Sequence, residues 1–207
     1  MKQELLNRYP VLESCIAEIE AARDAIIACY EAGGKLLLCG NGGSCADCDH
    51  ITGELMKGFL SRRPLDETRK NAMQAACPQL TEDTLAKLQQ GLPAISLVSM
   101  SGLNSAFCND VDPELIYAQS VLALGKPGDV LIGLSTSGNA QNVYAAAQVA
   151  KSIGMQVIGL TGQKGGLLKS VADVAVCVPE TETFKVQELH LPVYHYLCAA
   201  VEAHFYH

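Results

Sequence analysis

Four side chains of the types that bind divalent metal ions stand in two pairs with helical spacing. His50 and Glu54 are four residues apart, so they share one face of a predicted helix. Gln187 and His195 are eight apart, about two turns along one face of another helix. Two imidazoles, one carboxylate and one amide suit zinc among other divalent ions. A lone His and Glu at this spacing are more often a surface pair, so the metal-site hypothesis requires the two helices to converge.

Two short segments predict a binding site for a phosphate group. Each follows a predicted strand and precedes a predicted helix, where unpaired backbone N–H groups and the helix dipole favour an anion. One segment adds hydroxyls and the other adds glycines that permit close approach of a ligand. The predicted contacts are Ser135, Thr136, Ser137 and Asn139 in the first segment, and Asn41, Gly42, Gly43 and Ser44 in the second. Serine and threonine that merely cap a helix are the alternative interpretation of the first segment.

The glycine-containing segment 40–44 is not a nucleotide-binding motif. It has neither the glycine spacing of a dinucleotide fingerprint nor the Gly-Lys-Ser/Thr of a Walker motif. Without a lysine, backbone dipoles and hydroxyls would hold the anion, which favours a phosphate monoester over a nucleoside triphosphate. Asn109 and Asp110 are predicted in the loop after the second strand, where they could bind sugar hydroxyls or form an ordinary Asx turn.

The elements that would position these residues alternate along the chain. Five stretches rich in Val, Ile and Leu predict buried strands, and helical periodicity lies between them. This alternation is typical of an α/β protein with a doubly wound parallel sheet in three layers. The predicted strands are 35–39, 94–99, 129–135, 156–161 and 174–178, and the predicted helices between them include 44–58, 113–124 and 139–153.

Three further segments complete one predicted domain over residues 1–207. Residues 1–33 form an N-terminal extension with one or two amphipathic helices, and 183–205 predict a last helix in which Pro192 should cause a kink. Residues 65–92 are polar and interrupt the alternation, so we interpret them as an insertion. It contains a predicted helix that begins after Thr81 and ends at Gly91, and it could be a surface excursion, a lid or a subunit contact.

The composition narrows the class of protein. The net charge of −7 gives no basic surface for nucleic acid. No apolar run is long enough to span a membrane, and the first ten residues lack the features of a signal peptide, so a cytoplasmic protein is expected. Nine cysteines, an odd number, indicate reduced thiols rather than a disulfide framework.

Taken together, these motifs resemble the sugar isomerase (SIS) family, in particular its phosphoheptose isomerase branch. The resemblance rests on Gly40 to Ser44, His50 with Glu54, Asn109-Asp110, Ser135 to Asn139, and Gln187-Glu188-x-His190 with His195, and it covers nearly the whole chain outside the insertion. It implies a flavodoxin-like five-stranded fold and a cytoplasmic homotetramer. It also implies a divalent metal, usually zinc, on His50, Glu54, Gln187 and His195.

The activity that this resemblance implies is the isomerisation of sedoheptulose 7-phosphate to D-glycero-D-manno-heptose 7-phosphate for cell-surface glycans. The resemblance makes Glu54 the general base and His195 the general acid. A carboxylate and an imidazole suit this chemistry, because an enediol(ate) intermediate needs protons moved at carbon and at oxygen. Metal assistance would stabilise the developing oxyanion.

Two departures and two alternatives leave the sugar and the activity open. Met56-Lys57-Gly58 replaces the usual Thr-Gly-Arg, and Phe184 stands where an acidic sugar contact is expected. A non-catalytic SIS module that senses a phosphosugar or binds a partner protein is one alternative. A zinc or redox site at Cys45, Cys48 and His50 is the other, although two ordinary helix residues explain the cysteines more simply.

Overall fold

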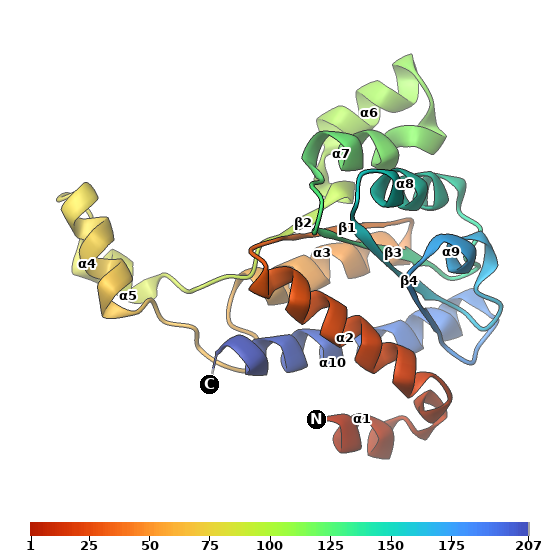
Figure 1. Cartoon of the computed structure of the whole chain (residues 1–207), viewed down its shortest axis with the longest axis horizontal. Helices are drawn as coiled ribbons and strands as arrows, with labels where there is room; N and C mark the ends of the chain where they lie inside the picture. Colours follow the sequence, from red (N-terminus) through yellow and green to blue (C-terminus); the bar gives the residue numbers. More distant parts are fainter. Residues whose placement is uncertain (207) are drawn as a thin grey trace.

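The computed structural model describes residues 1–206 and is built on one sheet of five parallel strands (Figure 1). Their order across the sheet is β2-β1-β3-β4-β5. This is the doubly wound order in which the crevice for a ligand opens where the strand order reverses, between β1 and β3. The predicted fold class is therefore confirmed. The strands are β1 (Leu36–Gly40), β2 (Ala94–Ser96), β3 (Val130–Ser135), β4 (Gln156–Thr161) and β5 (Val174–Cys177).

Helices cover both faces of the sheet and enclose a separate apolar cluster on each side (Figure 1). The strands are buried because both of their faces are covered, which explains their continuous apolar sequences. One face carries α1 (Lys2–Arg8), a 3-10 turn η1 (Pro10–Cys15), α2 (Ile16–Glu31), α3 (Gly43–Met56) and α10 (Thr183–Phe205). The other face carries α7 (Ile116–Leu124), α8 (Gln141–Ser152) and α9 (Gly166–Val171).

Two prolines have different effects on the helices. Pro10 opens η1 and separates α1 from α2, so the N-terminal extension contains two helices. Pro192 lies inside α10, which nevertheless runs from Thr183 to Phe205 as one element. Its ring has no N–H to donate, so the helix lacks one backbone hydrogen bond at this point.

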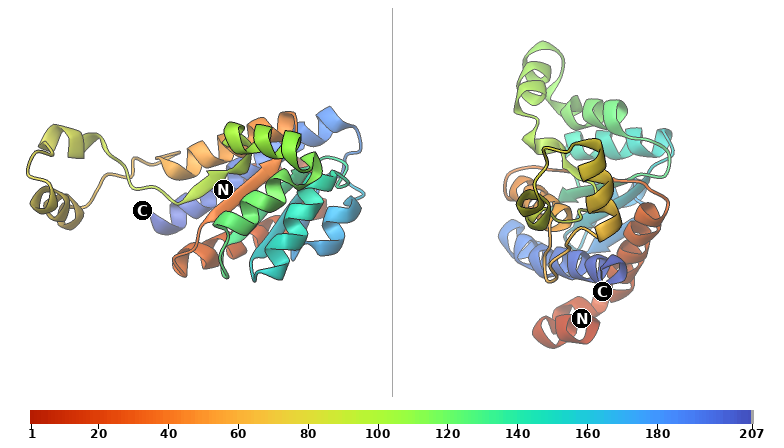
Figure 2. Two further views of the ribbon diagram at one scale, coloured as in Figure 1. Left: turned by 90° about the horizontal axis from the view of Figure 1, so that it is seen from above. Right: turned by 90° about the vertical axis from the view of Figure 1, so that its left-hand side faces the viewer.

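The insertion forms an arm of two helices that projects from the body (Figures 1 and 2). The first, α4 (Glu67–Ala76), was not predicted; the side chain of Asp66 caps it and none of its residues is buried. The second, α5 (Glu82–Lys87), begins after Thr81 as predicted, but it ends at Lys87 rather than at Gly91. An antiparallel bridge between Pro64 and Gln89 closes the base of the arm.

The region after the second strand differs from the prediction. The strand β2 ends at Ser96, and a 3-10 turn η2 (Leu97–Ser99) and a helix α6 (Ser101–Asp110) follow it. Asn109 and Asp110 therefore lie at the exposed end of α6 and not in a loop. A further 3-10 turn, η3 (Pro113–Leu115), forms the start of the segment that was predicted as one helix over 113–124. Over the described residues, no helix is long and apolar enough to cross a membrane.

Candidate active site

The two predicted phosphate loops meet at the carboxyl edge of the sheet and line one cavity of about 310 Å³. The loop after β1 forms one wall and the loop after β3 forms the opposite wall. Thr183 and Gln187, from the beginning of α10, complete the lining. Because α3 also begins at this cavity, two helix N-termini and several hydroxyls surround it. None of the described residues that line the cavity is a lysine or arginine, so an anion here would be held by dipoles and hydroxyls.

Two glycines are required by the backbone and by the packing of this cavity. Gly42 has φ +57°, a left-handed conformation that a residue with a side chain rarely adopts. A Cβ atom on Gly43 would meet the Nε2 atom of Gln187, so a larger residue would displace that amide from its present place. The glycines thus allow α10 to approach the loop and place Gln187 against it.

The side chain of Asn41 is held by two residues that the sequence did not single out. Asn41 and Asn142 exchange amide hydrogen bonds of 2.8 and 3.0 Å. The hydroxyl of Tyr117 donates to the carbonyl oxygen of Gly40 at 2.7 Å and approaches Oδ1 of Asn41 at 3.3 Å. These contacts join residues that are 76 to 101 positions apart, so local spacing carried no signal for them.

The loop after β3 is stabilised by its own polar side chains. Ser137 Oγ accepts the backbone N–H of Asn139, and Asn139 Oδ1 accepts the N–H of Leu167 from α9. Ser135, Thr136 and Ser137 line the cavity, whereas the Oδ1 atom of Asn139 contacts the first turn of α9. The structure therefore gives Asn139 a role in supporting the loop.

The predicted metal and proton-transfer residues converge where α3 packs on α10. The imidazole rings of His50 and His195 are 5.0 Å apart between centroids, and His50 Nε2 lies 3.3 Å from Glu54 Oε1. Lys57 donates to the other oxygen of Glu54 at 3.0 Å. Burial lowers the pKa of His195, and the nearby His50 lowers it further, so its neutral form is favoured.

These residues fit a divalent ion in chemistry. The Nε2 atom of His195 is buried and has no hydrogen-bond partner within residues 1–206, so no protein group competes with a ligand for it. Gln187 lies apart, against Gly43 at the phosphate cavity. Across the same described residues, no three His, Cys, Asp or Glu side chains are arranged to hold a metal on their own. The donor types fit zinc.

A tyrosine and an aspartate stand behind His50. The Nδ1 atom of His50 is 3.0 Å from the hydroxyl of Tyr194, which also donates to Oδ1 of Asp47 at 3.2 Å. Burial raises the pKa of Tyr194, and the charge of Asp47 adds to this, so the phenol keeps its proton. Sequence reasoning missed this contact because 147 residues separate Tyr194 from Asp47.

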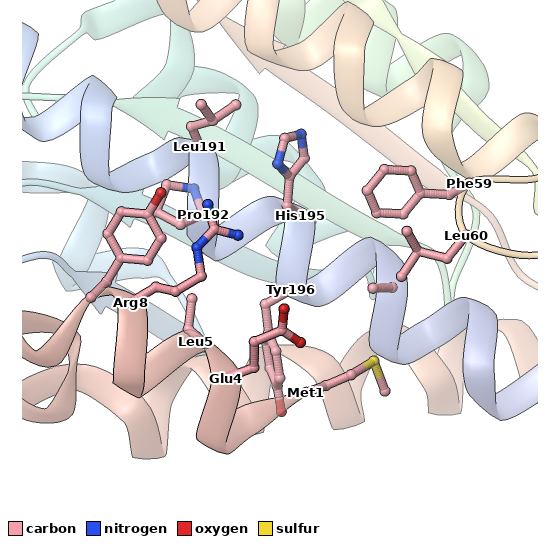
Figure 3. Close-up of a pocket in the computed structure, with 12 residues that line it drawn as sticks. Met1, Glu4, Leu5, Arg8, Phe59, Leu60, Leu191, Pro192, His195 and Tyr196 are labelled. Atoms are coloured by element: carbon pink, nitrogen blue, oxygen red, sulfur yellow. The ribbon is translucent and has the colours of Figure 1, made fainter.

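A second cavity, of about 360 Å³, lies between α1 and α10 on the other side of His195 (Figure 3). Leu5 and Arg8 from α1 face Pro192 and His195 from α10 across it. The ring of Phe59 lies 5.6 Å from that of His195 between centroids. Phe59 therefore lines this second cavity and also contacts His195.

His190, Cys45 and Cys48, which the sequence analysis also named, lie in environments that keep their side chains uncharged. His190 is fully buried, and burial lowers its pKa to about 4, so it stays neutral beside the carbonyl of Thr161. Burial raises the pKa of Cys45, and that of Cys48 well above its usual value, which disfavours a thiolate. Cys48 packs in the apolar cluster, so the structure offers no support for the thiol site.

Comparison with known proteins identifies the class to which this fold and site belong. The family model of the SIS domain matches residues 4–92 and 87–162, and the chain belongs to the SIS family.

The following relatives are phosphoheptose isomerases, which confirms the resemblance predicted from the sequence. The chain is 37% identical to the phosphoheptose isomerase of Roseiflexus sp. (strain RS-1) over 92% of its own length and 84% of the relative's. It is 38% identical to that of Burkholderia pseudomallei (strain 1710b) over 92% of this chain and 83% of the relative. The solved phosphoheptose isomerase of Neisseria gonorrhoeae superposes with a TM-score of 0.76 at 29% identity and covers 97% of this chain and 94% of its own.

Proposed function

We propose that this chain is a sugar-phosphate isomerase that interconverts sedoheptulose 7-phosphate and D-glycero-D-manno-heptose 7-phosphate. The observation that carries the proposal is the convergence of α3 and α10. It brings His50, Glu54 and His195 together, on two helices that both begin at the cavity with dipoles and hydroxyls for a phosphate. Similarity to phosphoheptose isomerases over more than nine tenths of the chain supports the choice of substrate.

The reaction requires one base and one acid at adjacent atoms of the sugar. Ser135, Thr136 and Ser137 hold the phosphate through hydroxyls and backbone N–H groups, which fixes the distance of the carbonyl carbon from the loop. Glu54 removes the proton from the carbon next to the carbonyl, and His195 gives a proton to the oxygen, which forms an enediol(ate). Return of the proton to the neighbouring carbon, with transfer of the other hydroxyl proton back to His195, forms the new carbonyl and completes the exchange of aldose and ketose.

A divalent metal, zinc by preference, belongs to the same proposal. His50, Glu54, Gln187 and His195 would hold it, and it would supply electrostatic stabilisation of the developing oxyanion. Coordination also lowers the basicity of a carboxylate, so Glu54 acts as base only when its contact with the ion is weak. His50, which has no assigned proton-transfer step, would then anchor the ion together with Gln187.

We further propose a cytoplasmic homotetramer as the working form. The relatives cover nearly the whole chain, and the two-helix arm projects from the body where a neighbouring subunit could contact it. Sedimentation of the purified protein tests this proposal, and a monomer at micromolar concentration would contradict it.

The function is tested by incubation of the zinc-loaded protein with sedoheptulose 7-phosphate in deuterated water. Deuterium at carbon 2 of an aldose product is expected, and Glu54→Gln should abolish it because the amide cannot take the proton. Lack of exchange with this ketose would contradict the heptose assignment. Lack of exchange with every phosphosugar tried, together with retained phosphosugar binding, would favour the non-catalytic SIS module instead.

A further inference from the structure

Tyr194 lies where it can decide which nitrogen of His50 carries the ring proton. Its hydroxyl contacts His50 Nδ1 at 3.0 Å on one side and Asp47 Oδ1 at 3.2 Å on the other. The phenol has one proton, so it can donate to only one of these two neighbours. The side chain is 1% exposed and sits between α3 and the sheet, so water cannot easily replace either contact.

The environment of Asp47 decides between the two directions. Its Oδ2 atom is buried and has no partner in the part of the chain that the structure describes, and Tyr194 is the donor to Oδ1. If the phenol donated to His50 instead, the carboxylate of Asp47 would have no donor among the described residues, and a buried polar atom without a hydrogen-bond partner is costly. The proton of Tyr194 therefore belongs on the side of Asp47. The phenolic oxygen then accepts, and His50 must donate through Nδ1–H.

We propose that Asp47 and Tyr194 are positioning residues that hold His50 as the Nδ1–H tautomer and so present its Nε2 lone pair beside Glu54. This inference rests on the proposed function, in which Nε2 binds the divalent ion with Glu54, 3.3 Å away. Histidine ligands commonly donate their second ring nitrogen to a carboxylate or carbonyl. Here a tyrosine stands between the histidine and the carboxylate.

The arrangement predicts a specific order of effects among three variants. Tyr194→Phe removes the hydroxyl and keeps the ring, so His50 loses its fixed tautomer and zinc affinity falls about 10- to 100-fold. Asp47→Ala frees the phenol to donate to Nδ1, which moves the ring proton to Nε2 and lowers zinc affinity further than Tyr194→Phe does. In the double variant no phenol remains to reverse the tautomer, so affinity returns to the level of Tyr194→Phe.

The experiment uses two readouts, and only one of them needs metal. Long-range ¹H–¹⁵N spectra of the metal-free protein, labelled with ¹⁵N in its five histidines, report the tautomer of His50 at mildly alkaline pH. The signals that disappear in His50→Gln assign those of His50. Zn²⁺ affinity is measured by competition with a chromophoric chelator. Tyr196→Phe is the matched control, because that hydroxyl lies two residues away on α10 and contacts Arg23 instead. It should change neither readout.

The outcomes separate this inference from the proposed function. An Nδ1–H tautomer that reverses in Asp47→Ala and loses its preference in Tyr194→Phe supports the positioning role, even if the protein binds no zinc and the metal assignment fails. An unchanged tautomer in both single variants overturns it. Additive losses of affinity in the double variant, with folding intact by far-ultraviolet circular dichroism, overturn it as well.

Discussion

Glu202→Gln should destabilise this protein far more than an ordinary loss of one surface charge. Glu202 is 2% exposed. Its carboxylate accepts hydrogen bonds of 2.7 to 3.0 Å from the backbone N–H groups of Phe59, Leu60 and Ser61. It also accepts Nε of Arg63 at 2.8 Å. One side chain thus anchors the loop that joins α3 to the arm.

The magnitude follows from what the substitution leaves behind. The side chain of Arg63 is fully buried, and its guanidinium would lose its only carboxylate partner among the described residues. Removal of one member of a buried ion pair costs about 3–5 kcal/mol. For a domain of this size, 1 kcal/mol shifts the midpoint by roughly 2–4 °C, so the melting temperature should fall by roughly 6–20 °C.

Urea unfolding at a fixed protein concentration, followed by far-ultraviolet circular dichroism, measures this loss. Asp83→Asn is the control, because it removes an equivalent charge from a surface ion pair with Lys87. The side chain of Asp83 is 75% exposed and that of Lys87 is 72% exposed. The control should cost less than about 1 kcal/mol. A loss for Glu202→Gln that is no greater than that of the control would refute the reasoning. Activity should fall as well, because the same loop places Phe59 against His195.

Three further predictions test the acid stability and the two halves of the site. Burial opposes ionisation of Glu202, but hydrogen bonds from the backbone and from Arg63 outweigh burial and lower the pKa of this carboxyl group. The ionised carboxylate therefore stabilises the fold fully above the unfolded pKa near 4.5, and this stabilisation is lost as pH falls through the lower folded pKa. The free energy of unfolding should consequently depend less on acid pH in Glu202→Gln than in the unsubstituted protein. Thr136→Val should weaken the binding of inorganic phosphate about 10- to 100-fold, because it removes a hydrogen bond of roughly 1.5–3 kcal/mol to a charged group. The melting temperature should change little. If calorimetry finds an unchanged phosphate affinity, the anion binds elsewhere. Gly43→Ala should displace the flexible amide of Gln187 and so reduce turnover and zinc affinity, at small cost in stability. Gly53→Ala on the same helix is the control, because a Cβ atom there meets open space and should stabilise the helix by roughly 0.5–1 kcal/mol. Equal turnover in the two variants would contradict the prediction for Gly43.

The sequence predicted the elements that bury apolar side chains and missed those that do not. All five strands are present because each is a continuous apolar run between helices, and the helix after Thr81 was found from its cap. The helices α4 and α6 bury none of their residues, so no run of apolar side chains marks them in the sequence. Asn109 and Asp110 were placed in a loop for this reason.

The candidate site was predictable where spacing along one helix defines it. Helical spacing placed His50 and Glu54 on one face of a helix, and the family resemblance selected them with His195; the structure brings these three together. Gln187 differs, because its position depends on how closely α10 approaches the glycine loop, which no local pattern encodes.

The helix α10 connects the parts of the site that the sequence keeps far apart. Gln187, His195 and Glu202 lie at intervals of eight and seven residues, or about 12 and 10 Å along the helix axis. They contact, in turn, the phosphate loop, the convergent histidine of α3 and the loop at the base of the arm. Since α10 packs against the sheet as a single element, a shift of the helix would move all three contacts together.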